Sequence, residues 1–248
     1  MCHIVKNYTL CYLMRLDNYL VEKGLSESRN KAQQIIKDGL VSVDEKSIKK
    51  PSFRVEEDAC VIIEEHKSYV SRAAYKLLYF LDEIALDVSD KRALDIGSST
   101  GGFTQVLLER GVREVSCVDV GHDQLHHSLR EDSRVRVYEG CDIRKFVTDE
   151  PFELIVSDVA FISLLNILDD VDRVGSRDII LLFKPQFEVG REVKRDKHGV
   201  VVDKKAIERA MQKFEDATAL KNWKLIAKSP SQLSGKEGNQ EWCYYFKK

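Results

Sequence analysis

Three acidic residues follow three short apolar runs of the sequence. Asp95 ends RALD and begins the glycine-rich stretch DIGSSTGGFT, Asp119 ends VSCVD, and Asp142 follows VRVYEGC. Because parallel strands end at a shared edge of a sheet, we expect these carboxylates at one ligand site. Asp95 would repel a phosphate and attract an amine, Asp119 could accept both hydroxyls of a ribose, and Asp142 could accept the amino group of adenine. This combination favours a cationic nucleoside such as S-adenosylmethionine.

The glycine-rich stretch itself disfavours two common ligands. It does not match the G-x-G-x-x-G of dinucleotide-binding turns, and it lacks the G-K-S/T of a phosphate-binding loop. We therefore assign the turn, and the acids around it, to S-adenosylmethionine. The predicted cofactor-binding residues are Asp95, Gly97, Ser98, Ser99, Thr100, Gly101, Gly102, Phe103, Asp119, Asp142 and Asp158.

Two further charged residues indicate what a bound methyl donor would react with. Asp158 follows the apolar run FELIVS, and Lys184 follows IILLF. The sequence around Asp158 lacks the Asn/Asp-Pro-Pro-aromatic motif of methyltransferases that act on exocyclic amines, and no Pro-Cys nucleophile for cytosine C5 lies nearby. A hydroxyl acceptor must lose a proton, and a lysine can take it if burial and a neighbouring cation depress its pKa. The residues therefore favour a hydroxyl acceptor.

Apolar strands alternate with amphipathic helices from residue 69 onward. Strands are expected at RALDIG, VSCVDV, VRVYEG, FELIVSDV and DIILLFKP, followed by WKLIAKSPS and WCYYFKK. Helices are expected near residues 70–84, 101–111, 122–130, 163–174 and 203–220. This alternation predicts an α/β fold with a doubly wound, Rossmann-like sheet, whose strand ends would bring the charged residues together.

The composition bounds the class of protein. The 248 residues are 43% hydrophobic and 32% charged, and no run approaches the ~20 apolar residues that span a bilayer. The six cysteines show no CxxC pair, which disfavours a disulfide framework or a metal site. This cysteine usage indicates that the protein is located in the reducing cytoplasm. Residues 15–54 carry nine Lys/Arg against six Asp/Glu, whereas residues 55–248 carry 29 against 35. A basic N-terminal segment followed by an acidic remainder suggests that residues 15–54 form a polyanion-binding module.

The basic segment, residues 15–54, is predicted to form two short helices followed by strands. Gly24 ends the first helix, Ser26 is the expected N-cap of the second, and Gly39 ends it. The string RLDNYL…GLSESRNKA…IKDGLVSV, within residues 15–55, resembles the S4 domain, an RNA-binding module of ribosomal and RNA-modifying proteins. Asp44-Glu45 stands where many S4 domains have Asn-Gly, which predicts a different turn type.

The sequence thus divides into an N-terminal extension, an S4 domain, a linker and a methyltransferase domain, at residues 1–14, 15–62, 63–68 and 69–248. Met14 directly precedes RLD, so residues 1–13 are expected to be an over-extended start. Basic residues of the S4 domain, of SRAAYKL and of the loop FKPQFEVGREVKRDKHGVV are the expected RNA contacts. They are Arg15, Arg29, Lys31, Lys37, Lys49, Lys50, Arg72, Lys194, Arg195 and Lys197. His198 of that loop is assigned no role in proton transfer.

Further motifs extend the resemblance along the chain. SRAAYKL, DIGSSTGGFT, SDVAFISL, FKPQFEVG and GNQEW, behind an S4 domain, resemble the TlyA-type rRNA 2′-O-methyltransferases, which have an FtsJ-like catalytic domain and are often called haemolysins. The Lys-Asp-Lys-Glu tetrad of that family falls on Lys76, Asp158, Lys184 and Glu241. The resemblance implies that Lys184 is the base for a ribose hydroxyl. It also implies that Asp158 and Glu241 hold the two lysines and that Lys76 supplies positive charge.

The resemblance further implies a substrate and a donor. It indicates 2′-O-methylation of a cytidine in ribosomal RNA within ribosomal subunits, with S-adenosylmethionine as donor; 23S rRNA is favoured and 16S rRNA stays open. Two alternatives are an RNA-binding assembly factor with an inactive methyltransferase fold and a pore-forming haemolysin. The intact tetrad disfavours the first, and the lack of an apolar span or of a strongly amphipathic apolar helix disfavours the second.

Overall fold

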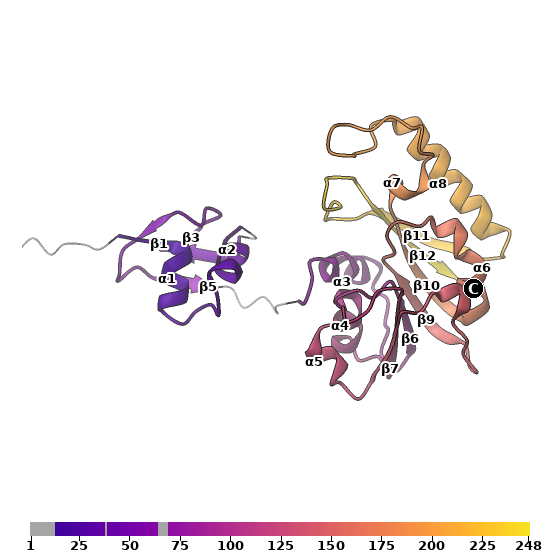
Figure 1. Cartoon of the computed structure of the whole chain (residues 1–248), viewed down its shortest axis with the longest axis horizontal. Coiled ribbons are helices and arrows are strands. Elements are labelled where there is room, and N and C mark those ends of the chain that lie inside the picture. The colour runs from indigo at the N-terminus through magenta and orange to yellow at the C-terminus, as the bar shows by residue number, and fades with distance from the viewer. Residues whose placement is uncertain (1–12, 38, 64–68) are drawn as a thin grey trace, which may run out of the picture. The chain divides into compact units, whose positions relative to one another are not determined.

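A computed structural model describes residues 13–37, 39–63 and 69–248 (Figure 1). The chain divides into two compact units, residues 1–68 and 69–248. The predicted extension falls outside the described residues up to position 12, and so do residues 64–68 of the predicted linker. Ile63, predicted to belong to the linker, is instead the last residue of strand β5 (Val61–Ile63). Among the described residues, no helix is long and apolar enough to cross a membrane.

The first unit packs two helices against short strands. Helix α1 (Leu16–Glu22) and helix α2 (Arg29–Lys37) are joined by the turn at Gly24. The strands are β1 (Met14–Arg15), β2 (Val41–Val43), β3 (Lys46–Ser47), β4 (Arg54–Val55) and β5 (Val61–Ile63). β1 pairs with β4, and β2 lies between β3 and β5. Leu16, Leu20, Ile36 and Val41 are fully buried, so this unit has a small core of its own.

Two details of this unit differ from the sequence prediction. Ser28, and not Ser26, caps α2, because its hydroxyl accepts a hydrogen bond from the backbone N–H of Lys31 at 3.3 Å. The two-residue turn between β2 and β3 has positive φ at both Asp44 and Glu45, 48° and 65°. That backbone is the one Asn-Gly adopts in a type I′ hairpin, so the expected change of turn type was wrong. Aspartate tolerates this left-handed region better than most residues, whereas glutamate adopts it rarely.

The second unit is built on one seven-stranded sheet with the order β11-β12-β10-β9-β6-β7-β8. Its parallel strands are β6 (Arg92–Ile96), β7 (Glu114–Asp119), β8 (Val135–Glu139), β9 (Phe152–Ser157) and β10 (Gly175–Phe183). β12 (Trp242–Lys247) is antiparallel to both neighbours, β10 and β11 (Lys224–Pro230). The doubly wound α/β sheet expected from the sequence is confirmed.

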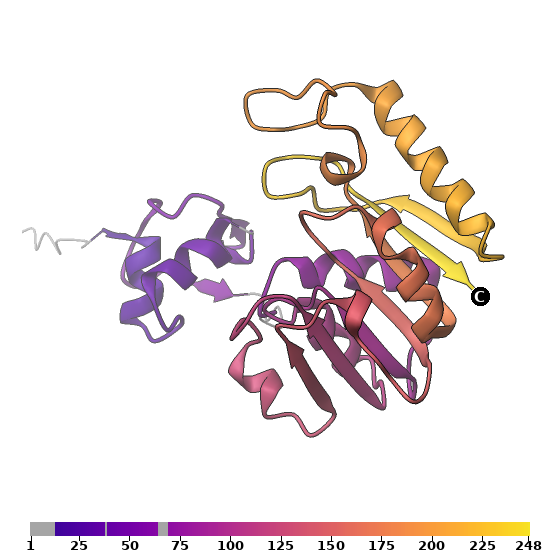
Figure 2. The same ribbon diagram turned by 45° about the vertical axis from the view of Figure 1, so that its right-hand side comes forward.

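Helices cover both faces of this sheet, which explains why its strands read as continuous apolar runs. Successive residues of one strand point to opposite faces. On one face, Ala93 packs with α3 (Ala73–Ile84), α4 (Gly102–Glu109) and α5 (His127–Arg130). On the other, Leu94 packs with α6 (Leu168–Val174), and Phe214 of α8 (Lys204–Ala219) joins the same core. Figure 2 shows α8 beside the β11–β12 pair.

The helices are shorter than the sequence suggested at two places. The expected helix 122–130 begins only at His127, because Asp123 has a left-handed φ of 53°, through which a right-handed helix does not continue. The Glu139 carboxylate accepts the backbone N–H groups of Asp123, Gln124 and Leu125 and stabilises this loop. The expected helix 163–174 is split into a 3₁₀ turn at Leu164–Asn166 and α6. A four-residue helix that we did not expect, α7 (Pro185–Glu188), follows Lys184.

Candidate active site

Two adjoining cavities open along the carboxyl ends of β6, β9 and β10. The larger has a volume of about 870 Å³ and the smaller about 470 Å³. They share lining residues from two turns, one after β6 and one after β9: Gly97, Ser99, Asp158, Ala160 and Phe161. The larger cavity is also lined by α3, by the residues after β10 and by the segment before β12. The site predicted at the strand ends therefore coincides with a two-part cleft in the second unit.

Asp158 and Lys184 form the first of two ion pairs in the larger cavity. Asp158 directly follows β9 and Lys184 directly follows β10, and because these strands are parallel neighbours, their ends lie side by side. The Nζ atom of Lys184 lies 2.5 Å from Oδ1 of Asp158 and 3.4 Å from its backbone carbonyl oxygen. Oδ1 receives no hydrogen bond among the described residues, so this contact is electrostatic and poorly directed.

Lys76 and Glu241 form the second ion pair. Lys76 lies on the inner side of α3, and Glu241 immediately precedes β12. Nζ of Lys76 donates a hydrogen bond of 2.6 Å to Oε2 of Glu241, and both side chains are buried. Two residues 165 positions apart in the chain are thus joined by a buried salt bridge, which requires both partners because one alone would be an uncompensated buried charge.

All four residues predicted as the catalytic tetrad line the same cavity. Each lysine faces one carboxylate at 2.5–2.6 Å, so the four charges balance. A buried, balanced group of this kind can hold a lysine amine in a fixed position at a water-poor site, where electrostatic effects are stronger than in water.

Asp95 shows the strongest change of acidity at the site. It is 1% exposed, and burial, with smaller contributions from Asp158 and Asp119, raises the pKa of its carboxyl group to about 7. Its Oδ2 accepts a hydrogen bond from the Thr104 hydroxyl at 2.7 Å. Its Oδ1 has no hydrogen-bond partner among the described residues. A buried acceptor without a donor, at the wall of a cavity, fits a ligand that carries an ammonium group.

Asp119 connects the turns after β6 and β7. Its Oδ2 accepts the backbone N–H of Ser99 at 2.8 Å, and its Oδ1 accepts the backbone N–H of Gly121 at 2.7 Å. Ser99 has a φ of 46°, a left-handed conformation that this bond supports. Each carboxylate oxygen keeps a second lone pair, so Asp119 can still accept a pair of hydroxyls in the smaller cavity.

Asp142 lines the smaller cavity but is already paired. Its Oδ1 accepts hydrogen bonds from the backbone N–H and the Nε of Arg144 at 3.0 and 2.9 Å, and its Oδ2 from Nη2 at 2.5 Å. The Arg144 guanidinium holds the pKa of the Asp142 carboxyl at about 2. The sequence did not anticipate Arg144, which fixes the orientation of the carboxylate predicted to bind adenine.

The glycines of DIGSSTGGFT make room for protein as well as for a ligand. A Cβ at Gly97 would meet Cγ1 of Val159 at 3.1 Å, and a Cβ at Gly102 would meet Oγ of Ser71 at 2.2 Å. Gly101 faces Leu125 and Leu129 and does not line either cavity. These residues thus let the turn lie close to its protein neighbours, and Gly101 is a packing position. Of the predicted cofactor-binding residues, ten line the two cavities: Asp95, Gly97, Ser98, Ser99, Thr100, Gly102, Phe103, Asp119, Asp142 and Asp158.

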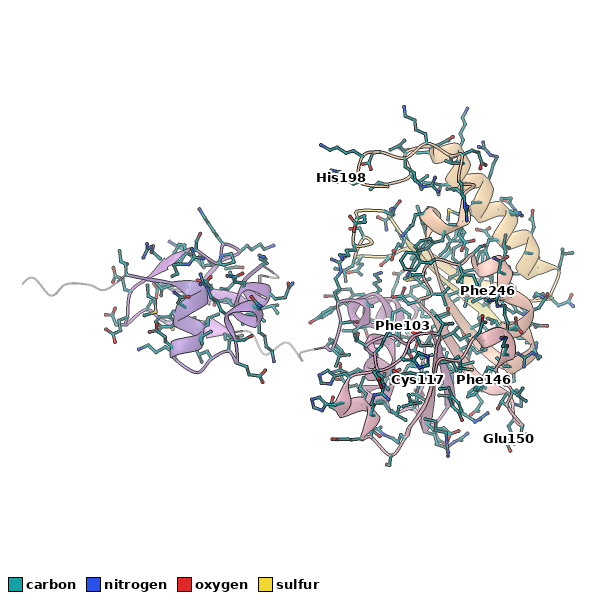
Figure 3. The ribbon with its side chains drawn as sticks, viewed as in Figure 1. Phe103, Cys117, Phe146, Glu150, His198 and Phe246 are labelled. Atoms are coloured by element: carbon teal, nitrogen blue, oxygen red, sulfur yellow. The ribbon has the colours of Figure 1, made fainter. Side chains whose placement is uncertain are left out.

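The basic loop between α7 and α8 is tied to the segment that carries Glu241. Asn239 is buried; its Oδ1 accepts the backbone N–H of Val201 at 3.0 Å, and its Nδ2 donates to the carbonyl of Gly199 at 3.4 Å. His198, labelled in Figure 3, lies on this loop and lines the larger cavity. Asn239 therefore connects the loop to the catalytic segment, a role that the motif GNQEW did not reveal.

The predicted RNA contacts fall into different surroundings. Arg195 donates to the carbonyls of Val193 and Arg191 at 2.8 and 3.1 Å, so it shapes its own loop. Arg72 donates to the carbonyl of Ser234 at 2.6 Å and lines the larger cavity. Lys31 pairs with Glu27 at 3.0 Å. Arg15 and Arg29 both contact Asp17. The remaining predicted lysines are exposed: Lys37, Lys49, Lys50, Lys194 and Lys197.

Sequence reasoning missed an aromatic pair at the mouth of the cleft. Phe161, shortly after β9, is 92% exposed and lines both cavities. Its ring lies 5.4 Å from that of Phe187 on α7. The φ of Phe161 is 65°, which is rare for a bulky residue and marks local strain of the kind found at functional sites. The motif SDVAFISL contained this phenylalanine, but only the backbone shows that it points outward.

Two family models match the chain. The FtsJ-like methyltransferase model matches residues 69–248, and the S4 domain model matches residues 14–59. Together the fold and these matches define a methyltransferase joined to an S4 domain. The 23S rRNA (cytidine-2′-O)-methyltransferase TlyA of Campylobacter jejuni is 44% identical over 252 residues, covering 94% of this chain and 99% of that protein. The chain belongs to the TlyA family of FtsJ-like methyltransferases.

Other relatives agree with this assignment. The 16S/23S rRNA (cytidine-2′-O)-methyltransferase TlyA of Mycobacterium tuberculosis is 37% identical, covering 94% of this chain and 89% of that protein. The solved structure of a hemolysin candidate from Streptococcus thermophilus superposes with a TM-score of 0.70 at 31% identity, covering 96% of this chain and 89% of that one. The resemblance inferred from the motifs is confirmed.

Proposed function

We propose that the protein transfers a methyl group from S-adenosylmethionine to the 2′-hydroxyl of a cytidine in 23S rRNA. The observation that carries this proposal is the pair of buried lysine–carboxylate contacts in one cavity at the strand ends. A lysine beside a donor-binding turn suits a hydroxyl acceptor, which needs a base. The named activity of the Campylobacter jejuni relative, 44% identical over nearly its whole length, supports the same reaction and the same RNA.

Lys184 is the proposed base. The acceptor oxygen bonds to the methyl carbon of S-adenosylmethionine as the carbon–sulfur bond breaks and S-adenosylhomocysteine leaves, and the oxygen must lose its proton in this step. Lys184 accepts this proton when its side chain is in the amine form, and the ion pair with Asp158 is its protonated state. Asp158, 2.5 Å from Nζ, holds the lysine in place and stabilises the ammonium that results. Lys76, held by Glu241, provides positive charge near the developing negative oxygen.

The donor is held by three carboxylates at successive strand ends. Asp95 presents its unpartnered Oδ1 to the α-ammonium group of the donor. Asp119 accepts the ribose hydroxyls, and Asp142, oriented by Arg144, accepts the adenine amino group. Phe161 and Phe187, at the mouth of the cleft, offer aromatic faces on which the base of the target nucleotide can stack.

The two units have different functions. The S4 unit supplies affinity for ribosomal RNA through phosphate contacts, and residues 69–248 carry the chemistry. The exposed lysines of the loop between α7 and α8, Lys194 and Lys197, add phosphate contacts next to the cleft. Because the substrate is part of a ribosomal subunit, the enzyme acts in the cytoplasm.

Methyl transfer to purified ribosomal subunits tests the proposal. Subunits from a strain that lacks the enzyme are incubated with donor labelled in its methyl group, and the RNA is then hydrolysed with alkali. A 2′-O-methyl group blocks hydrolysis at its 3′ phosphate, so label in an alkali-resistant dinucleotide that begins with cytidine is expected. Label in 50S but not 30S subunits would fit a 23S target, and label in both would add a 16S target. No transfer would favour an RNA-binding assembly factor.

A further inference from the structure

The first unit contains a fully buried carboxylate under two of its proposed RNA-binding arginines. The Asp17 side chain is 0% exposed, while those of Arg15 and Arg29 are 35% and 54% exposed. Arg15 donates from Nε and Nη2 to the two oxygens of Asp17, each at 2.9 Å. Nε of Arg29 lies 3.1 Å from Oδ2, and Nε2 of Gln33 lies 2.8 Å from the same oxygen.

The carboxylate connects three elements. Arg15 ends β1, Asp17 is in the first turn of α1, and Arg29 and Gln33 are one turn apart on α2. Asp17 is therefore the common acceptor that sets the directions of both guanidinium groups. The hydrogen bonds from Arg15, Gln33 and Arg29 lower the pKa of the Asp17 carboxyl well below its usual range, as expected for a carboxylate with several donors.

The geometry leaves hydrogen-bond donors turned away from the carboxylate. A guanidinium has five N–H donors. Among the described residues, Arg29 uses only its Nε toward Asp17, and Arg15 uses Nε and one Nη. Two positive charges share one buried negative charge, so the cluster has a net positive charge at the surface. Fixed, partly exposed guanidinium groups suit the bidentate recognition of phosphate.

We propose that Asp17 is a positioning residue for RNA binding: it holds the guanidinium groups of Arg15 and Arg29 in fixed directions, so that they can bind backbone phosphate. We call this pair of arginines the fork. This inference rests on the proposed function of the S4 unit as the RNA-binding part. It makes a counterintuitive prediction about charge. Removing the Asp17 charge makes the unit more basic, and overall electrostatics alone would then strengthen RNA binding. Loss of the fork instead weakens it, because both arginines become free to move and each must be ordered when RNA binds.

Filter binding of the full-length protein to 50S subunits, across a range of salt concentrations, tests the inference. Asp17→Asn keeps the shape of the side chain and is expected to weaken binding about three- to tenfold and to reduce the salt slope by about one unit. The matched control is Glu27→Gln, which also removes one negative charge from the unit but at an exposed site beside Lys31. This control is expected to leave binding unchanged or slightly tighter.

The same substitution in the Arg15→Ala/Arg29→Ala background separates positioning from a general loss of structure. If Asp17 acts through the arginines, Asp17→Asn should cause no further loss of RNA affinity there. An equal loss in both backgrounds would show that Asp17 only supports the fold and would overturn the proposal. A thermal melt of each variant records folding directly, and donor binding should not change, because the donor cleft lies within residues 69–248.

Two other outcomes separate this inference from the proposed function. Tighter binding by Asp17→Asn, together with weaker binding by Arg15→Ala/Arg29→Ala, would overturn the positioning role and leave the S4 unit as the RNA-binding part. Unchanged binding by Arg15→Ala/Arg29→Ala would also overturn the positioning role, because the arginines would then contribute no phosphate contact, but Lys37, Lys49 and Lys50 would remain as RNA contacts of the S4 unit.

Discussion

In the methyltransferase cleft each buried lysine faces one carboxylate, whereas in the S4 unit two arginines share one. The cleft pairs, Lys76–Glu241 and Lys184–Asp158, are balanced in charge and largely shielded from water. The cluster around Asp17 buries only the carboxylate and leaves the cations partly exposed. The difference suggests two uses of paired cations and carboxylates. Balanced, buried charges stabilise changes of charge during a reaction, and excess exposed charge attracts a polyanion.

The largest expected effect is on the rate of methyl transfer. Lys184→Ala is expected to reduce methyl transfer by about 10²–10⁴-fold, the usual contribution of a general base, and to leave donor affinity unchanged. Lys184→Arg should be as inactive, because a guanidinium does not give up its proton in proteins. Single-turnover transfer from labelled donor and calorimetric titration of the donor measure the two quantities. Substantial activity in Lys184→Arg would show that only positive charge is needed at this position.

Substitutions in the Lys76–Glu241 pair distinguish its contribution to stability from its contribution to methyl transfer. Glu241→Gln leaves the Lys76 ammonium buried without its carboxylate, which should lower the free energy of unfolding by about 3–5 kcal/mol. Adding Lys76→Met removes that charge and should restore most of the stability without restoring methyl transfer. Chemical denaturation of both variants, with the wild type alongside, checks this order. A double variant as unstable as Glu241→Gln would mean that the pair is not the cause of the loss.

Asp95 is expected to make donor binding depend on pH. Its pKa is raised to about 7 without donor, and a bound cation favours the charged carboxylate, so protons compete with the donor. Donor affinity is therefore expected to fall as pH decreases from about 7, by up to about tenfold per pH unit. Calorimetry between pH 5.5 and 7.5 measures this slope. Asp95→Asn should bind the donor weakly at every pH and lose the slope; a slope that persists in this variant would locate the titrating group elsewhere.

The smallest expected effect concerns two neighbouring cations of α2. Arg29→Ala should weaken RNA binding and lower the salt slope by about one unit, since each phosphate contact releases counterions. Lys31→Ala should change the affinity less, because Lys31 is exposed and already pairs with Glu27 at 3.0 Å. Filter binding of both single variants and the double variant compares them. Equal effects of the two would indicate that the fork around Asp17 has no special part in binding.

The general architecture could be predicted because it depends on local patterns. Continuous apolar runs alternating with amphipathic helices indicated the doubly wound sheet, and the strand ends placed Asp95, Asp119 and Asp158 near one another. The resemblance to a known family supplied Lys76 and Glu241, which no local pattern singled out. Their contact spans 165 positions and depends on how α3 and β12 pack against the same sheet. The assigned roles of these residues remain predictions.

Other features could not be predicted because they depend on backbone geometry or on partners. The positive φ of Phe161 turns an apolar residue outward, whereas its sequence context reads as buried. Ser28 replaced Ser26 as the cap of α2 because the turn after Gly24 is longer than the pattern suggested. Arg15, Arg29 and Lys31 looked equivalent as basic residues, but their partners Asp17 and Glu27 distinguish them.

The position of β12 has a consequence for how the enzyme is made. Among the described strands β12 comes last in chain order, yet it lies between β10 and β11, and Glu241 directly precedes it. During synthesis, β10 and β11 cannot be joined until residues 242–247 have left the ribosome, and Lys76 lacks its carboxylate until then. Chains that lack this segment therefore expose open sheet edges and lack the Lys76–Glu241 ion pair. Completion of the sheet and formation of the Lys76–Glu241 ion pair therefore depend on the same short segment, residues 241–247.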